Sequence, residues 1–341
     1  MKKLFCVLIL AAVTASTVSV SASVGAGDYG CGNSGSIDLS QRLGAVRNQG
    51  VNGLCWAYSA AAAMRNELCR EGHPRCGDAS FQPSIPDATA CARKNLNIFP
   101  VGKESSGGRP ERALSCMLGK GVCSEENASI EKYRQAVKGM GEFCPIDPCA
   151  SDKSSDMKNY IDNLANATQQ SSVHGFGDEN SDEYALLNLP AKAACVYKSV
   201  IGESCKRNRA VLREAKTVAP QTLMLLKKSS PEVMEILNNL LKSDKTPILA
   251  VCLDNVAIPE LQKGLAAAEK AEKAEKAEES GAAGRGCGNA HAVTIGGVRC
   301  HNGEAEYYVH NSWGKNAPFH GWIPASKFIA ASLDVTFIGK K

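Results

Sequence analysis

Apolar residues are arranged differently in the early and late parts of this chain. Residues 55–70 include an alanine-rich run at 60–64 and are apolar on several sides, which predicts a buried helix. Residues 247–253 are continuously apolar and short, as in a buried strand. By the same criteria, further helices are expected over 110–118 and 231–241, and further strands over 291–296, 306–310 and 335–338. Helices early and strands late predict an α+β fold, in which a helical lobe packs against a β lobe with a cleft between them.

Two segments do not fit this core. Residues 134–230 are polar and mostly compatible with helix, and they carry their own cysteines. Residues 261–286 contain Glu-Lys-Ala repeats followed by a glycine-rich end, which predicts a solvated helix with a flexible linker after it. The expected organisation is a helical lobe over 23–133, an insertion over 134–230, and a β lobe over 231–341 that includes the charged insertion 261–286.

The first 22 residues have the features of a secretory signal peptide. Lys2 and Lys3 precede an apolar run over residues 4–13, and Val20, Ser21 and Ala22 form a small-residue cleavage site. The alternative is a membrane anchor, but the apolar run is short for a bilayer. We therefore expect cleavage after Ala22 and a secreted or periplasmic protein that is not membrane-bound after cleavage.

Charge and cysteine content narrow the class further. The formal net charge of the 341-residue chain is +4, and the signal peptide carries two of these charges, so nothing argues for nucleic acid as a partner. The chain has 15 cysteines, a number that in an exported protein predicts disulfides. Cys144 and Cys149 have no CxxC partner pair, which argues against a zinc site, and no metal or cofactor is expected.

The cysteine connectivity stays open at this level. Short loops would be closed by four pairings: Cys69–Cys76, Cys116–Cys123, Cys144–Cys149 and Cys195–Cys205. A Cys287–Cys300 pair would need a bend, because an extended strand of that length spans about 40 Å while bridged Cα atoms lie within about 7 Å.

Four residues have the chemistry of a thiol hydrolase. Cys55 opens the predicted helix, and the positive end of a helix favours a thiolate. Gln49 precedes it by six residues and could donate to an oxyanion. His291 could act as general base, with Asn311 fixing its tautomer and Trp313 covering that hydrogen bond. Four such elements in this order rarely coincide by chance.

The segments around these residues resemble the papain-like cysteine peptidases, over roughly 37–133 and 231–330, in a secreted, bacterial type with insertions. The resemblance implies a two-lobed papain-like fold and hydrolysis of protein or peptide substrates through a thioester. It also implies that Gly107 and Gly108 line the substrate cleft, where a peptide backbone approaches closely. Arg109 and Pro110 fall on one wall of the main specificity pocket and Ala292 on the other, with Trp313 nearby.

Departures from the family leave other activities open. A disulfide usual in the family is absent, because Asn52 and Ser105 stand at its two ends, and Leu54 replaces a small residue before the nucleophile. The stretch between Ala22 and Cys55 is too short for the family's inhibitory pro-segment, so we expect an enzyme exported active or restrained by an insertion. The alternatives are a cell-wall peptide hydrolase and an occluded peptidase scaffold that acts as a binding protein.

Overall fold

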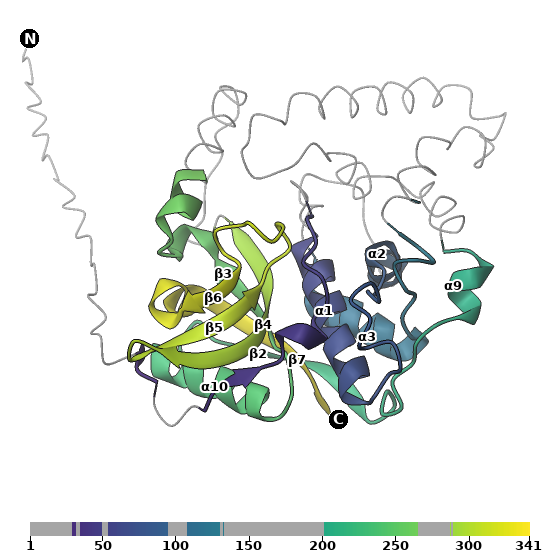
Figure 1. Cartoon of the computed structure of the whole chain (residues 1–341), viewed down its shortest axis with the longest axis horizontal. Helices are drawn as coiled ribbons and strands as arrows, with labels where there is room; N and C mark the ends of the chain where they lie inside the picture. The colour runs from purple at the N-terminus through teal and green to yellow at the C-terminus, as the bar shows by residue number, and fades with distance from the viewer. Residues whose placement is uncertain are drawn as a thin grey trace, which may run out of the picture.

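The computed structural model describes residues 29–31, 35–49, 54–94, 108–129, 132, 201–264, 287 and 289–341. The expected signal peptide, most of 134–230 and of 261–286, and Gly107 lie outside these residues. The described part forms a helical lobe beside a β lobe, with the two meeting along α1 and β4 (Figure 1). In this part of the chain, no helix has the length and apolar character needed to cross a membrane.

A seven-stranded antiparallel sheet forms the β lobe. Its strands are β1 (Ile37–Asp38), β2 (Val218–Met224), β3 (Ile248–Cys252), β4 (Ala290–His301), β5 (Glu304–His310), β6 (Gly321–Pro324) and β7 (Ser332–Lys340). Their order is β2-β7-β3-β4-β5-β6, and β1 adds to the far end of β4. A tight turn joins β4 to β5, where Asn302 and Gly303 both have positive φ. Strands distant in sequence thus come together on β4, the strand that carries His291.

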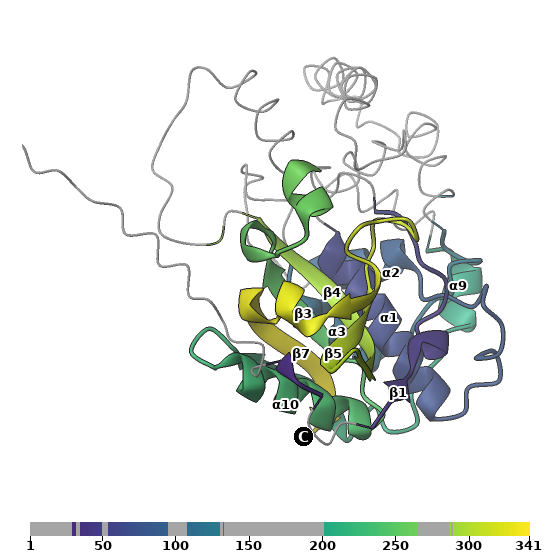
Figure 2. The same cartoon turned by 60° about the vertical axis from the view of Figure 1, so that its left-hand side comes forward.

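The helix α10 (Ser230–Lys242) covers one face of the sheet, on the side away from α1 (Figure 2). Its apolar residues Val233, Leu237 and Leu241 are buried in the same core as the sheet residues. A capping box between Ser229 and Glu232 satisfies its first amide groups. The amphipathic pattern that predicts this helix therefore also determines which face of the sheet it covers.

The helical lobe contains α1 (Cys55–Arg70), α2 (Ile85–Lys94), α3 (Pro110–Lys120) and the short α9 (Glu203–Arg207). Helix α1 is buried on nearly all sides, as its alanine-rich composition predicts. Short 3₁₀ turns complete the fold: Ser40–Arg42, Leu253–Asn255, Ala325–Lys327 and Ile329–Ala331. Buried Arg65 in α1 donates to four loop carbonyls, from Phe81, Gln41, Cys76 and Asp78, so this one charged side chain organises the loops around the helix.

Two side chains join α1 to β4. The Ser59 hydroxyl donates to the Ala292 carbonyl at 2.9 Å, and the Thr294 hydroxyl donates to the Ser59 carbonyl at 3.1 Å. All three residues are buried. Buried hydrogen bonds of this kind fix two elements in register, because losing one partner leaves the other unsatisfied. The helix that begins at Cys55 is thereby held against the strand that begins beside His291.

Four disulfides connect described cysteines: Cys31–Cys300, Cys69–Cys76, Cys123–Cys205 and Cys252–Cys287. The short-loop pairing Cys69–Cys76 is confirmed. The pairings Cys116–Cys123 and Cys195–Cys205 are wrong, because Cys123 and Cys205 are bonded to each other. Loop length alone could not reveal this pair, since its members are 82 residues apart and are brought together only by the fold.

The predicted helices and strands are confirmed, with ends shifted by up to a few residues, and β4 runs on to His301. One expected boundary is wrong: the segment 134–230 contains β2, a strand of the main sheet rather than of an insertion. Strand β2 lies at the sheet edge, where Pro220 is tolerated, and four of its seven residues are exposed. Its partner β7 lies more than 100 residues later, so neither composition nor local pattern indicates this strand.

Strand β1 also departs from the expected division. It belongs to the range 23–133, assigned to the helical lobe, yet it pairs with β4. Only two residues pair there, which is too few for a hydrophobic pattern to appear.

Candidate active site

Cys55 is the first residue of α1, and its side chain is partly exposed. No side chain caps this end of the helix, and the amides of Cys55 and Trp56 lie at the thiol. Desolvation raises the pKa of the Cys55 thiol, while the amides of Ala292, Trp56 and Cys55 itself lower it again. Among cysteines whose side chains the structure describes, Cys55 alone is free of a disulfide.

His291 lies near the start of β4, opposite Val251 of β3, and is buried. Its Nε2 donates to the Asn311 Oδ1 at 2.8 Å, which leaves Nδ1 as the ring nitrogen available to a nucleophile. Burial lowers the pKa of His291 to about 4, and the Asn311 hydrogen bond opposes this shift. Because the amide of Ala292 lies at the Cys55 sulfur, the fold brings the thiol and the base together.

Asn311 is fully buried directly after β5. Its Oδ1 accepts from His291 and also from the Ser312 amide at 2.7 Å, so the amide orientation is fixed from two sides. The Trp313 ring stacks on the imidazole of His291, with centroids 4.1 Å apart and planes 21° from parallel. Trp313 therefore lies against the imidazole that makes the His291–Asn311 hydrogen bond.

Gln49 is buried, and the segment around Ser312 holds it at the site. The backbone N–H of Gln49 donates to the Ser312 carbonyl at 2.6 Å. The neighbouring Asn48 forms an isolated β-bridge with Trp313. The Ser312 hydroxyl donates to Gln49 Oε1, which turns the Nε2 donor to the opposite side of the carboxamide. The backbone thus connects the predicted oxyanion donor directly to the segment that carries the orienting amide.

Sequence reasoning missed two supporting residues. Ser312 holds Gln49, and Ser59 joins α1 to β4. The signal for Ser59 was present in part, because it is a polar residue inside an otherwise apolar helix. Its partner is more than 200 residues away, so the sequence could not show what it bonds.

The expected substrate wall is partly described. A Cβ on Gly108 would overlap the Trp56 ring, so only glycine fits there. Pro110 opens α3, and Ala292 packs in the core shared with α1. Arg109, in contrast, is 74% exposed and lies 3.6 Å from the Glu111 carboxylate.

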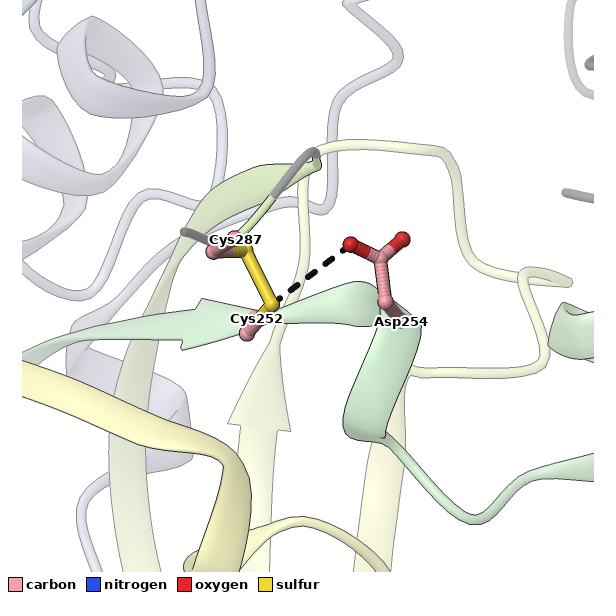
Figure 3. Close-up of side chains that lie close together, drawn as sticks. All are labelled: Cys252, Asp254 and Cys287. Carbon is pink, nitrogen blue, oxygen red and sulfur yellow. Dashed lines mark hydrogen bonds between the residues drawn. A yellow bond between two sulfur atoms is a disulfide. The ribbon is translucent and has the colours of Figure 1, made fainter. Parts of the chain in front are cut away.

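Three potential metal ligands lie close together at the entrance to β4 (Figure 3): Cys252, Asp254 and Cys287. The two sulfurs are bonded to each other, so neither is a thiolate ligand. The Asp254 carboxylate accepts a hydrogen bond from the side chain of Asn289 at 2.7 Å, and Asn289 lies two residues before His291. This group of residues therefore anchors the chain that leads to His291.

Comparison with known proteins identifies the family of this chain. The profile of the papain family cysteine proteases matches residues 34–211, which is more than half of the chain and includes Cys55. No curated protein matches. Among solved structures, the chain is similar to xylellain, a cysteine protease from Xylella fastidiosa, at 16% identity and a TM-score of 0.46, over 90% of this chain and 86% of that one.

It is also similar to SERA5E from Plasmodium falciparum, at 13% identity and a TM-score of 0.41, over 89% of this chain and 92% of that one. A recombinant stem bromelain precursor matches at 18% identity and a TM-score of 0.44, over 90% of this chain and 70% of that one. The family match over 34–211 covers the part of the chain that contains the proposed thiol and its helix. This chain belongs to the papain family of cysteine proteases.

Proposed function

We propose that Cys55 is the nucleophile of this cysteine peptidase, His291 its general base and acid, and Asn311 the residue that orients the imidazole. One observation carries the proposal: His291, bonded to Asn311 and covered by Trp313, is followed by an amide that lies at the Cys55 sulfur. An activated nucleophile needs such a base, held in turn by a third group.

Burial raises the pKa of Cys55 and lowers that of His291, so each residue alone favours its neutral form. Transfer of the thiol proton to Nδ1 then creates both charges together, and their mutual attraction offsets the desolvation of each. The sulfur attacks the substrate carbonyl carbon, and the C–N bond breaks as the imidazolium protonates the leaving amine. Water, deprotonated by His291, hydrolyses the thioester and restores the thiol.

The developing oxyanion needs donors beside Cys55. We assign the Gln49 Nε2 group and the Cys55 amide to this role, because Ser312 orients the Gln49 carboxamide and no side chain caps the start of α1. One such donor typically contributes about 3–4 kcal/mol to transition-state binding.

The substrate backbone is proposed to lie along Gly107 and Gly108, with Pro110 and Ala292 bordering the cleft. The tight contact of Gly108 with Trp56 supports this, because a chain without Cβ allows close approach to the residue that follows Cys55.

The protein is further proposed to be exported, with cleavage after Ala22, and to act on proteins or peptides in a secreted or periplasmic location. Four disulfides in the described part support an oxidising compartment. Of the expected insertions 134–230 and 261–286, the part of the first that precedes β2 and the whole of the second are still proposed as insertions.

The test uses the mature protein and a fluorogenic peptide library. The variants Cys55→Ser and His291→Ala should lose hydrolysis and labelling by a peptidyl thiol-trapping inhibitor. The matched control is His301→Ala, since His301 is 55% exposed and outside the site. Wild-type labelling at Cys55 with hydrolysis of cell-wall peptides alone would favour the cell-wall hydrolase. Absence of both labelling and hydrolysis would indicate an occluded scaffold.

A further inference from the structure

A small cavity lies where the first two turns of α1 meet the end of β5. Its volume is about 10 Å³, which is close to the room that one water molecule needs. Six residues line it: Arg47, Tyr58, Ser59, His310, Asn311 and Ser312. Each of them has a polar side chain, so the cavity suits a polar occupant, whereas apolar cavities in proteins stay dry.

Two buried atoms of the residues that line this cavity lack a partner. Within the part of the chain that the structure describes, neither His310 Nδ1 nor Asn311 Nδ2 makes a hydrogen bond. Asn311 is fully buried, and His310 is 9% exposed. A buried polar atom without a partner destabilises the folded state, and proteins commonly satisfy such an atom with an ordered water molecule.

The other hydrogen bonds around the cavity define what its occupant must do. The Ser59 hydroxyl donates to the Ala292 carbonyl, and the Ser312 hydroxyl donates to Gln49 Oε1. Each hydroxyl has thereby used its one hydrogen, so it can only accept a hydrogen bond from an occupant. The Asn311 Nδ2 group can only donate. The occupant therefore has to accept and donate at once, as water does.

The charges at the cavity are balanced. The Arg47 guanidinium lies 3.5 Å from the Glu125 carboxylate. Burial lowers the pKa of His310 to about 3, and the positive charges of His320, Arg47 and Arg65 add to this shift, so the His310 ring is neutral. A neutral ring can accept a hydrogen bond at Nδ1 when its proton is on Nε2. The balance favours a neutral occupant over an ion.

We propose that this cavity binds one water molecule, which accepts a hydrogen bond from Asn311 Nδ2 and donates one to His310 Nδ1. His310 is thereby a positioning residue: through the water it fixes the nitrogen end of the carboxamide whose Oδ1 holds His291. The two ends of the Asn311 side chain are then both bonded, and the imidazole keeps one orientation. This inference rests on the proposed function of Cys55, His291 and Asn311.

The kinetic test uses two substitutions of His310. His310→Phe keeps a ring but offers the water no hydrogen bond, whereas His310→Asn keeps a polar atom at the position of Nδ1. His310→Phe should lower kcat by about 10-fold, the effect of one unsatisfied buried group, and leave KM unchanged. His310→Asn should stay within about 2-fold of wild type, because the water keeps its partner. Titration of the active site with the thiol-trapping inhibitor restricts kcat to folded enzyme.

A double-mutant cycle shows whether His310 acts through Asn311. In the Asn311→Ala background, His310→Phe should have no further effect on kcat, since the group that it positions is gone. The matched control is His301→Phe, at an exposed histidine outside the site, which should leave kcat unchanged in both backgrounds. A kcat of His310→Phe equal to wild type, an equal loss in both backgrounds, or a failure of His310→Asn to restore the rate overturns the positioning role.

A crystal structure of the Cys55→Ser protein tests the water site without reference to activity. A water molecule within about 3.2 Å of both His310 Nδ1 and Asn311 Nδ2 is expected. A dry cavity, or a direct hydrogen bond between the two atoms, overturns the site. If the wild-type enzyme cleaves no peptide, the proposed function is refuted and the positioning role fails with it, while the crystal structure still decides on the water.

Discussion

Acid should destabilise this protein strongly, because two buried histidines are held neutral. Burial lowers the pKa of His291 to about 4 and that of His310 to about 3. Arg47, Arg65 and His320 add repulsion at His310, so protonating it in the folded state is doubly unfavourable.

The direction in which stability changes with pH follows from the number of protons that the folded and unfolded chains bind. Between pH 6.5 and the lowered pKa, the unfolded chain binds protons at both histidines and the folded chain does not, so stability falls as the pH falls. From pH 7 to pH 4.5, each histidine should cost about 2–3 kcal/mol, and the two together about 5 kcal/mol. This is a large part of the stability of a typical domain.

The assay is urea unfolding of the Cys55→Ser protein at several pH values, with His310→Gln as the perturbing variant. His310→Gln should lose only about half as much stability as the parent over this pH range, whatever its stability at pH 7. The control is Lys227→Gln, at an exposed position before α10, which should keep the full dependence. Parallel pH profiles for the parent and His310→Gln would refute the reasoning, because the histidine could not then be neutral through burial.

Three further predictions concern the site. Asn311→Ala should lower kcat more than it raises KM, since Asn311 orients the imidazole; a pure KM effect in steady-state kinetics would contradict this. Gln49→Ala should lower kcat by about 10²–10³-fold as an oxyanion donor, and an unchanged rate would place that site elsewhere. Gly108→Ala should displace Trp56 and cost about 1–3 kcal/mol in thermal unfolding, with lower kcat/KM; full stability would mean that Trp56 moves freely.

Local sequence determined the elements of this fold that depend on their own composition. Three elements were predictable: the alanine-rich α1, the amphipathic α10 and the continuously apolar β3. Each has a pattern of apolar residues that can be recognised within a short stretch of chain. The two-residue strand β1 and the edge strand β2 were not, because only hydrogen bonds to distant parts of the chain define them.

The sequence also indicated which groups are the proposed reacting groups. Cys55, His291, Asn311 and Gln49 were recognisable from residue type, order and context, and Trp313 from its place after Asn311. A motif specifies which atoms are needed, since the chemistry tolerates few alternatives.

Only the tertiary structure decided how these groups are supported. The hydroxyl bonds of Ser59 and Ser312, and the Cys252–Cys287 link before β4, join residues from distant parts of the chain. Sequence reasoning placed Arg109 on a wall of the cleft, whereas the pairing of β3 with both β4 and β7 puts Ala292, Ala250 and Asp334 on one face of the sheet. Register decides which side chains share a face of a sheet, and register is a property of pairing between strands that no single strand contains.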